Sequence, residues 1–175
     1  MMADMNLVTL NIALSMLSLS DILKLSKPDI LFLQEVNFST QSLRDRVDTL
    51  GYSGECNVDP LQPTLPGTAI VWEKNPQNIR EVNQLLEGRV MSVKCGGETF
   101  LNIYIPSGSV KKRERCEMFN ELATLLLAMG RDQLPVKLGD WNYILAEIDT
   151  TSNFAAKYCK VLHTIVQTLL YPRVR

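Results

Sequence analysis

The hydrophobic pattern of the chain changes repeatedly between strand-like and helix-like segments. Residues 6–11 alternate between apolar and polar side chains, which is typical of a half-buried strand. Residues 29–34 (DILFLQ) contain a continuous apolar run, which is typical of a strand covered on both faces. The same pattern predicts further strands at 67–72, 89–95 and 98–105, and one that Pro135 opens and Gly139 breaks.

Apolar residues at helical spacing predict four helices between these strands. The first covers residues 14–25 and is stopped by Pro28, because proline cannot continue a helix. The second can be capped by Ser39 or Thr40 and is closed by Gly51. The remaining helices are expected at 110–129 and 154–170.

The order of these elements favours an α/β fold with mixed sheets. Gly96-Gly97 stands between two of the expected strands and is typical of a two-residue hairpin turn. A purely parallel sheet would lack that antiparallel hairpin, so we expect mixed sheets with helices outside. Residues 52–66 contain three prolines, and we expect a loop there.

Composition narrows the class of protein. A chain of 175 residues is long enough for one domain with a sizeable core, and a net charge of -1 gives no general basic field for nucleic acid. The chain contains no run of eighteen apolar residues, which a membrane-spanning helix would need, and its first residues do not resemble a signal peptide. Four widely spaced cysteines form no CxxC pair, which favours reduced thiols in an intracellular protein.

Two polar residues follow the strand that Pro135 opens. Asp140 and Asn142 lie two positions apart, so on an extended segment their side chains point the same way. A carboxylate can bind a metal or accept a proton from water, and an amide can donate to a phosphate oxygen. Glycine, aspartate and asparagine are also common in turns, so a simple turn stays an alternative.

Three other strand ends carry a polar residue. Asn11, Glu35 and Tyr104 each end an expected strand. Singly, each has a structural interpretation: Asn11 as a helix cap, Glu35 as a residue at the rim, and Tyr104 as a core side chain. Together they favour a site, because open sheets bind ligands at the carboxyl ends of their strands.

Several short motifs that contain these residues resemble those of a known family. The motifs TLN, LQE, GTAIVW, NIYIPSG and GDWN, with Asp149-Thr150-Thr151 downstream, occur in the order seen in the endonuclease/exonuclease/phosphatase superfamily. That superfamily includes the abasic-site endonucleases and the DNase I-like enzymes. The chain is most similar to the endonuclease domain that begins the second open reading frame of non-LTR (LINE-type) retrotransposons.

This resemblance implies a fold, a reaction and a set of roles. The fold would be a four-layer α/β sandwich, with two mixed sheets face to face and helices outside. Glu35 would bind Mg²⁺ or Mn²⁺ with help from Asn11, and Asp140 would orient or deprotonate the attacking water. Asn142 and Tyr104 would hold the scissile phosphate of DNA, and no membrane is implied.

The chain departs from the family near its end. It contains no Ser-Asp-His, which closes the family's site, and its one histidine, His163, lies on the polar side of the last expected helix. By comparison with the family we expect a single, incomplete domain, truncated so that its C-terminal strands are missing.

A basic run precedes the third expected helix. Lys111, Lys112, Arg113 and Arg115 could contact phosphates beside a DNA groove. The alternative is a solvated first helical turn, where basic residues are mildly unfavourable.

Three functions stay open at this stage. The first is a Mg²⁺-dependent DNA endonuclease, which would be nuclear. The second is a non-catalytic remnant that binds DNA or a protein, and the third is a small-molecule or lipid phosphatase. The Pro-Ser-Gly segment and its basic helix argue against the third, while the missing Ser-Asp-His separates the first two. The sequence does not indicate an oligomeric state.

Overall fold

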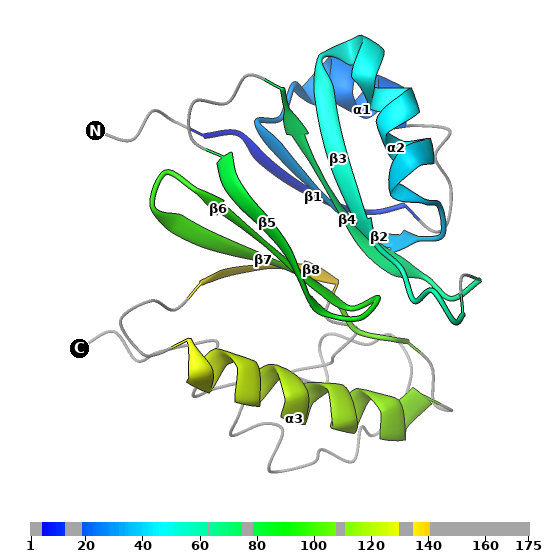
Figure 1. Cartoon of the computed structure of the whole chain (residues 1–175), viewed down its shortest axis with the longest axis vertical. Helices are drawn as coiled ribbons and strands as arrows, with labels where there is room; N and C mark the ends of the chain where they lie inside the picture. Colours follow the sequence, from blue (N-terminus) through cyan, green and yellow to red (C-terminus); the bar gives the residue numbers. More distant parts are fainter. Residues whose placement is uncertain are drawn as a thin grey trace, which may run out of the picture. The chain divides into compact units, whose positions relative to one another are not determined.

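The structure is a computed structural model that describes residues 5–12, 19–62, 64–74, 79–107, 111–129 and 135–140 (Figure 1). These residues belong to two compact units. One holds the described residues up to Tyr104 and those from Pro135 to Asp140, and the other holds those between Ile105 and Met129. The elements are β1 (Leu7–Asn11), α1 (Leu19–Ser26), β2 (Ile30–Val36), α2 (Thr40–Val47), η1 (Asp48–Leu50), β3 (Tyr52–Asn57), β4 (Gly67–Glu73), β5 (Ile79–Leu86), β6 (Val90–Cys95), β7 (Glu98–Tyr104), α3 (Lys112–Ala128) and β8 (Val136–Asp140).

The strands form two mixed sheets in the first unit. The first sheet has the order β1-β2-β4-β3, with β1 and β2 parallel and the other pairs antiparallel. The second has the order β5-β6-β7-β8, with β7 and β8 parallel and the other pairs antiparallel. The predicted α/β class with two mixed sheets and outer helices is therefore confirmed. The Gly96-Gly97 hairpin is confirmed too, because both glycines have positive φ and join β6 to β7.

An apolar core joins the two sheets, which lie face to face in Figure 1. Ile30, Phe32 and Ile70 of the first sheet pack against Met91 and other residues of the second. The rings of Phe32 and Phe100 meet across this layer with centroids 6.4 Å apart. Each such side chain contributes about 1.5–3 kcal/mol when it is buried. This core places the strand ends of one sheet close to those of the other.

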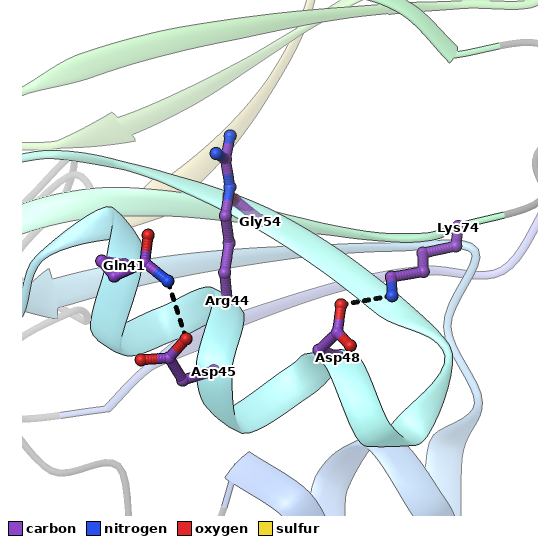
Figure 2. A network of polar contacts seen from close by, with 6 residues as sticks. All are labelled: Gln41, Arg44, Asp45, Asp48, Gly54 and Lys74. Carbon is purple, nitrogen blue, oxygen red and sulfur yellow. Dashed lines mark hydrogen bonds and ion pairs between the residues drawn. The ribbon is translucent and has the colours of Figure 1, made fainter.

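The helices α1 and α2 cover the outer face of the first sheet (Figure 1). Their buried residues form one cluster with β2, β3 and β4: Leu19, Leu23, Leu43, Val47 and their sheet neighbours. Ser39 caps α2, since its hydroxyl accepts a hydrogen bond from the Ser42 amide at 3.1 Å. Figure 2 shows the outer side of α2 and η1, where Asp48 pairs with Lys74. Such exposed pairs contribute about 0–1 kcal/mol, so the buried face dominates the stability of this layer.

Three parts of the sequence-based fold are wrong. The loop expected at 52–66 begins as strand β3, and only the segment after Asn57 carries the three prolines. Leu25, the last residue of the first expected helix, does not contribute to the apolar face that predicted this helix, because its exposed fraction is 86%. Strand β5 was not predicted at all. The expected helix start at 14–18 and the helix at 154–170 lie outside the described residues.

The helix α3 belongs to the second unit and confirms the helix expected at 110–129. Met118 and Leu122 are buried as expected, together with Phe119 and Leu126. Across the described residues, no helix is both long and apolar enough to cross a membrane.

Candidate active site

The carboxyl ends of the two parallel strand pairs carry four of the predicted site residues. Asn11 ends β1, and the parallel register pairs it with Gln34, the residue before Glu35 on β2. Tyr104 ends β7 and is the parallel partner of Asp140, the last residue of β8. Parallel strands bring their carboxyl ends to one edge of a sheet, so each pair presents two polar groups together.

A hydrogen bond connects the two pairs. The Asn11 side chain donates from Nδ2 to Oδ2 of Asp140 over 2.7 Å, across 129 positions of sequence. Asn11 is exposed and Asp140 is half-buried, so both groups can reach solvent or a ligand. The amide has only its Oδ1 left as an acceptor or metal ligand once Nδ2 is used this way. The two sheets thus contribute to a single polar cluster.

Glu35 has an unusual backbone. Its φ is +58°, in the left-handed region that residues with a side chain rarely adopt. It occupies a bulge, because Gln34 pairs with Thr68 and Val36 with Gly67, while Glu35 has no partner on β4. Bulges redirect side chains and occur often beside active sites. A strained backbone of about 1–2 kcal/mol held by the surrounding pairs is typical of a functional position.

Asp140 depends on the glycine before it. Gly139 has a φ of +128°, and a Cβ there would lie 1.9 Å from the carbonyl oxygen of Ile103 on β7. The strand was expected to break at Gly139, but β8 continues through it to Asp140. Only glycine lets β8 approach β7 closely enough to place Asp140 opposite Tyr104.

Tyr104 is almost completely buried, with an exposed fraction of 4%. The guanidinium carbon of Arg89 lies 5.2 Å from the centre of its ring, which is a cation–π contact. Arg89 also donates from Nη1 to the Pro66 carbonyl at 3.1 Å, and its own carbonyl accepts from the Tyr104 amide at 2.9 Å. These contacts fix both the backbone and the ring of Tyr104 at the end of β7.

Comparison with solved structures finds proteins of similar fold. An AP endonuclease from Archaeoglobus fulgidus matches with a TM-score of 0.74 and 21% identity, over 95% of this chain and 70% of that protein. A 3′ phosphatase from Neisseria, solved with a product DNA hairpin, matches with a TM-score of 0.70 and 22% identity over the same shares. The catalytic domain of human Nocturnin, solved with a sulfate anion, matches with a TM-score of 0.53 and 21% identity, over 71% of this chain and 55% of that protein.

The chain has the DNase I-like fold. No family model matches the sequence, and a search of curated proteins finds no significant match. At these identities the likeness shows the fold alone. What this chain can do therefore depends on which of its residues the DNase I-like fold brings together.

The donor set at the strand ends fits a hard divalent cation. No group of three His, Cys, Asp or Glu gathers among the described residues, so a zinc-type cage is not formed by them. Mg²⁺ needs no such cage, because it keeps several waters and takes one or two carboxylates. Neither the hydrogen bonds nor the ion pairs of the described residues involve the Glu35 carboxylate, which suits a metal ligand.

The remaining predicted residues lie outside the described residues or in the second unit. Asn142 and His163 lie outside the described residues. At the start of α3, Lys111 pairs with Glu114 and Arg113 with Glu117, each at 2.7 Å. Arg115 donates to the Pro106 carbonyl at 3.3 Å, and the side chain of Lys112 is outside the described part. These intrahelical pairs agree with the solvated-turn interpretation, and DNA contact by this run stays a prediction.

Sequence reasoning missed three residues near the site. Arg89 was assigned only to a strand start, and nothing local indicates that it meets Tyr104. Gln34 and Asn102 are the other two: both are polar within apolar strands, which was the available signal. Their exposed fractions are 2% and 0%, and they bond to each other between the sheets.

Proposed function

We propose that this chain hydrolyses phosphodiester bonds in DNA with a divalent metal ion, as an endonuclease of the retroelement type. The observation that carries the proposal is the hydrogen bond from Asn11 to Asp140. It joins the carboxyl ends of both parallel pairs, so that residues from two sheets can act on one bound phosphate.

Each residue has a role that suits its chemistry. Asp140, held by Asn11, orients the attacking water and accepts its proton. Tyr104 and Asn142 donate to the phosphate oxygens, where negative charge develops during the reaction. Glu35, directed by its bulge, would hold Mg²⁺ or Mn²⁺ through its carboxylate, with help from the amide of Asn11. When bound there, the ion supplies positive charge close to the phosphate.

DNA is the proposed substrate on the basis of the structural neighbours. One neighbour is an AP endonuclease, and another is a 3′ phosphatase solved with a product DNA hairpin. The motif resemblance to LINE-type endonuclease domains favours internal cleavage of a duplex, and a nuclear location follows from such a substrate. The basic run that begins at Lys111 would add phosphate contacts outside the reacting centre.

A plasmid-nicking assay tests this proposal. Purified protein is incubated with supercoiled DNA and Mg²⁺, with EDTA as the metal-free control. We expect nicking that requires the metal and falls at least about 100-fold in Glu35→Ala and in Asp140→Ala. Glu98→Gln is the matched control, because Glu98 is an exposed carboxylate at the opposite end of β7 from Tyr104. Equal nicking by all variants would indicate a contaminating nuclease.

A second candidate is binding to DNA or to a protein without cleavage. The specific observation in its favour is the absence of Ser-Asp-His from the 175 residues. It predicts no nicking above the EDTA background, together with retention of a labelled duplex that weakens steeply as salt is raised. The two candidates are therefore separated by the same protein preparation.

A further inference from the structure

Two buried amide side chains lie between the sheets next to the candidate site. Gln34 Nε2 donates to Asn102 Oδ1 over 2.7 Å. Asn102 Nδ2 in turn donates to the carbonyls of Leu33 at 2.9 Å and Ala69 at 2.8 Å. Asn102 belongs to β7, and all three of its partners belong to β2 or β4. One residue of the second sheet is thus hydrogen-bonded three times to the first.

These amides are adjacent to the site residues along each strand. Gln34 directly precedes Glu35 and is the cross-strand partner of Asn11. Asn102 lies two residues before Tyr104, so their side chains point to the same face of β7. The two buried amides therefore lie close to three residues of the candidate site: Asn11, Glu35 and Tyr104.

Apolar packing alone does not fix how two sheets align. Burial of apolar surface is non-directional and tolerates small sliding movements, whereas hydrogen bonds weaken steeply when their angles change. In a buried, low-dielectric layer such bonds are also stronger than in water. A catalytic group must be held within about 0.5 Å of its productive position.

We propose that Gln34 and Asn102 are positioning residues. Their bonds hold Asn11 and Glu35 of the first sheet in place against Tyr104 and Asp140 of the second. The catalytic meaning of this inference rests on the proposed function, but its geometric content is testable without it.

The chain provides a matched control for Asn102. Asn57 is also buried, with an exposed fraction of 1%, and also makes three hydrogen bonds. Its Nδ2 donates to the carbonyls of Leu86 and Val90, and its Oδ1 accepts from the Gly88 amide. It therefore ties β3 to the turn between β5 and β6, on strands at the opposite ends of both sheet orders from β1 and β8. Asn57→Ala removes as many hydrogen bonds as Asn102→Ala, but away from the Asn11–Asp140 contact.

The first test is nuclear magnetic resonance of the side-chain amide of Asn11 and the Cα of Glu35. We expect Asn102→Ala to shift both signals and to speed hydrogen exchange of the Asn11 amide at least about tenfold, because its bond to Asp140 is loosened. In Asn57→Ala both should stay close to wild type. Equal changes in the two variants, or none in Asn102→Ala, would overturn the inference. If Asn102→Ala does not fold, Gln34→Met takes its place. It removes the bond to Asn102 together with those to the Thr9 hydroxyl at 3.1 Å and the Phe32 carbonyl at 3.3 Å, and leaves Asn102 bonded to the carbonyls of Leu33 and Ala69.

The second test is the rate of Mg²⁺-dependent nicking at a temperature where both variants are folded. Displacement of a catalytic group by about 1 Å lowers rates by about 100-fold, so Asn102→Ala should lose kcat by that factor with KM for DNA within about threefold. Asn57→Ala should retain the wild-type kcat. A purely structural role predicts equal losses in melting temperature and unchanged kcat in both. If wild type does not nick but the resonance shifts occur, the proposed function fails and the positioning role stands.

Discussion

At one edge of the first sheet, the parallel strand pair and the antiparallel pairs both carry polar residues. Those at the parallel pair are the more exposed. Asn11, Gln34, Thr68 and Asn57 lie in register across the four strands of the first sheet. Beside the parallel pair, Asn11 is exposed and Glu35 is half-buried. On the antiparallel side, Thr68 and Asn57 are buried.

The second sheet also has a parallel and an antiparallel side, but the residues at its parallel end are less exposed, since Tyr104 is buried and Asp140 is half-buried. Its parallel pair ends in Tyr104 and Asp140, while its antiparallel pair β5 and β6 turns back at a segment that bonds to Asn57. Two parallel strands end together, so their last side chains can meet a ligand. An antiparallel pair brings one strand end and one strand start to that edge, and its polar groups stabilise the connecting turn. The comparison assigns chemistry to the first kind of end and stability to the second.

The largest expected effect concerns the glycine that lets β8 approach β7. Gly139→Ala should lower the free energy of unfolding by more than about 4 kcal/mol or displace β8, because the new Cβ would overlap the Ile103 carbonyl. Gly97→Ala is the control, since Gly97 also has positive φ but has no atom within 4 Å of a Cβ position. That variant should lose only about 1–2 kcal/mol. Urea unfolding measures both, and equal losses would show that close approach at Gly139 is unimportant.

A buried thiol tests whether the antiparallel strand end has a structural role. Burial raises the pKa of Cys56, next to Asn57, to about 12. Folding therefore favours the protonated thiol. The contribution of this raised pKa to the free energy of unfolding is complete below pH 9 and is lost as the pH rises from about 9 towards 12. At pH 8 the thiolate fraction should be about 1000-fold below that of an ordinary thiol.

Alkylation of native protein followed by peptide mass analysis measures this directly. We expect Cys56 to stay unmodified at pH 8 and to react at once after denaturation. Rapid labelling of Cys56 in the native protein would contradict the buried, structural character of this strand end.

Two non-glycine residues of the described part have a left-handed backbone, and a comparison of them distinguishes backbone strain from a functional role. Lys27 and Glu35 have φ of +41° and +58°. Glycine at either position should raise the free energy of unfolding by about 0.5–1 kcal/mol, because the conformational strain is removed. Only Glu35→Gly should also abolish metal-dependent nicking. Thermal unfolding and the nicking assay together test this, and loss of nicking in Lys27→Gly would contradict the assignment of the chemistry to Glu35.

The smallest expected effect is at Thr68. Its buried hydroxyl has no hydrogen-bond partner among the described residues. Thr68→Val should therefore leave the free energy of unfolding unchanged or raise it by less than about 1 kcal/mol. The reason is that a methyl group of similar shape replaces an unsatisfied hydroxyl. Thr40→Val is the control and should lose about 1 kcal/mol, because the Thr40 hydroxyl accepts from the Cys56 amide at 3.0 Å. A clear loss in Thr68→Val would show that this hydroxyl is satisfied in solution.

Local patterns predicted the elements whose sequence signals are strong. The apolar run of β2, the cap at Ser39 and the Gly96-Gly97 turn were all predicted, because each depends on neighbours in the chain. The two unpredicted strands, β3 and β5, stand at the ends of the described sheet orders. Both carry many polar residues (YSGECN and IREVNQLL), so their apolar alternation is weak.

The candidate site was predictable by residue and not by geometry. Strand ends and motif order singled out Asn11, Glu35, Tyr104 and Asp140. The bulge at Glu35 arises because Gln34 pairs with Thr68 and Val36 with Gly67, 34 and 31 positions away, and the Gln34–Asn102 bond joins residues 68 positions apart. No local pattern reports contacts of that range, which only the packed sheets create.

Nicking by four proteins tests the central claim that two sheets form one phosphodiesterase centre. The set is wild type, Glu35→Ala from the first sheet, Asp140→Ala from the second, and the double variant, all with Mg²⁺. Residues that act as a unit are strongly non-additive. We predict that each single change lowers the rate at least about 100-fold and that the double variant is no slower than the slower single one. Wild type that does not nick above the EDTA background, or losses that multiply in the double variant, would contradict the claim.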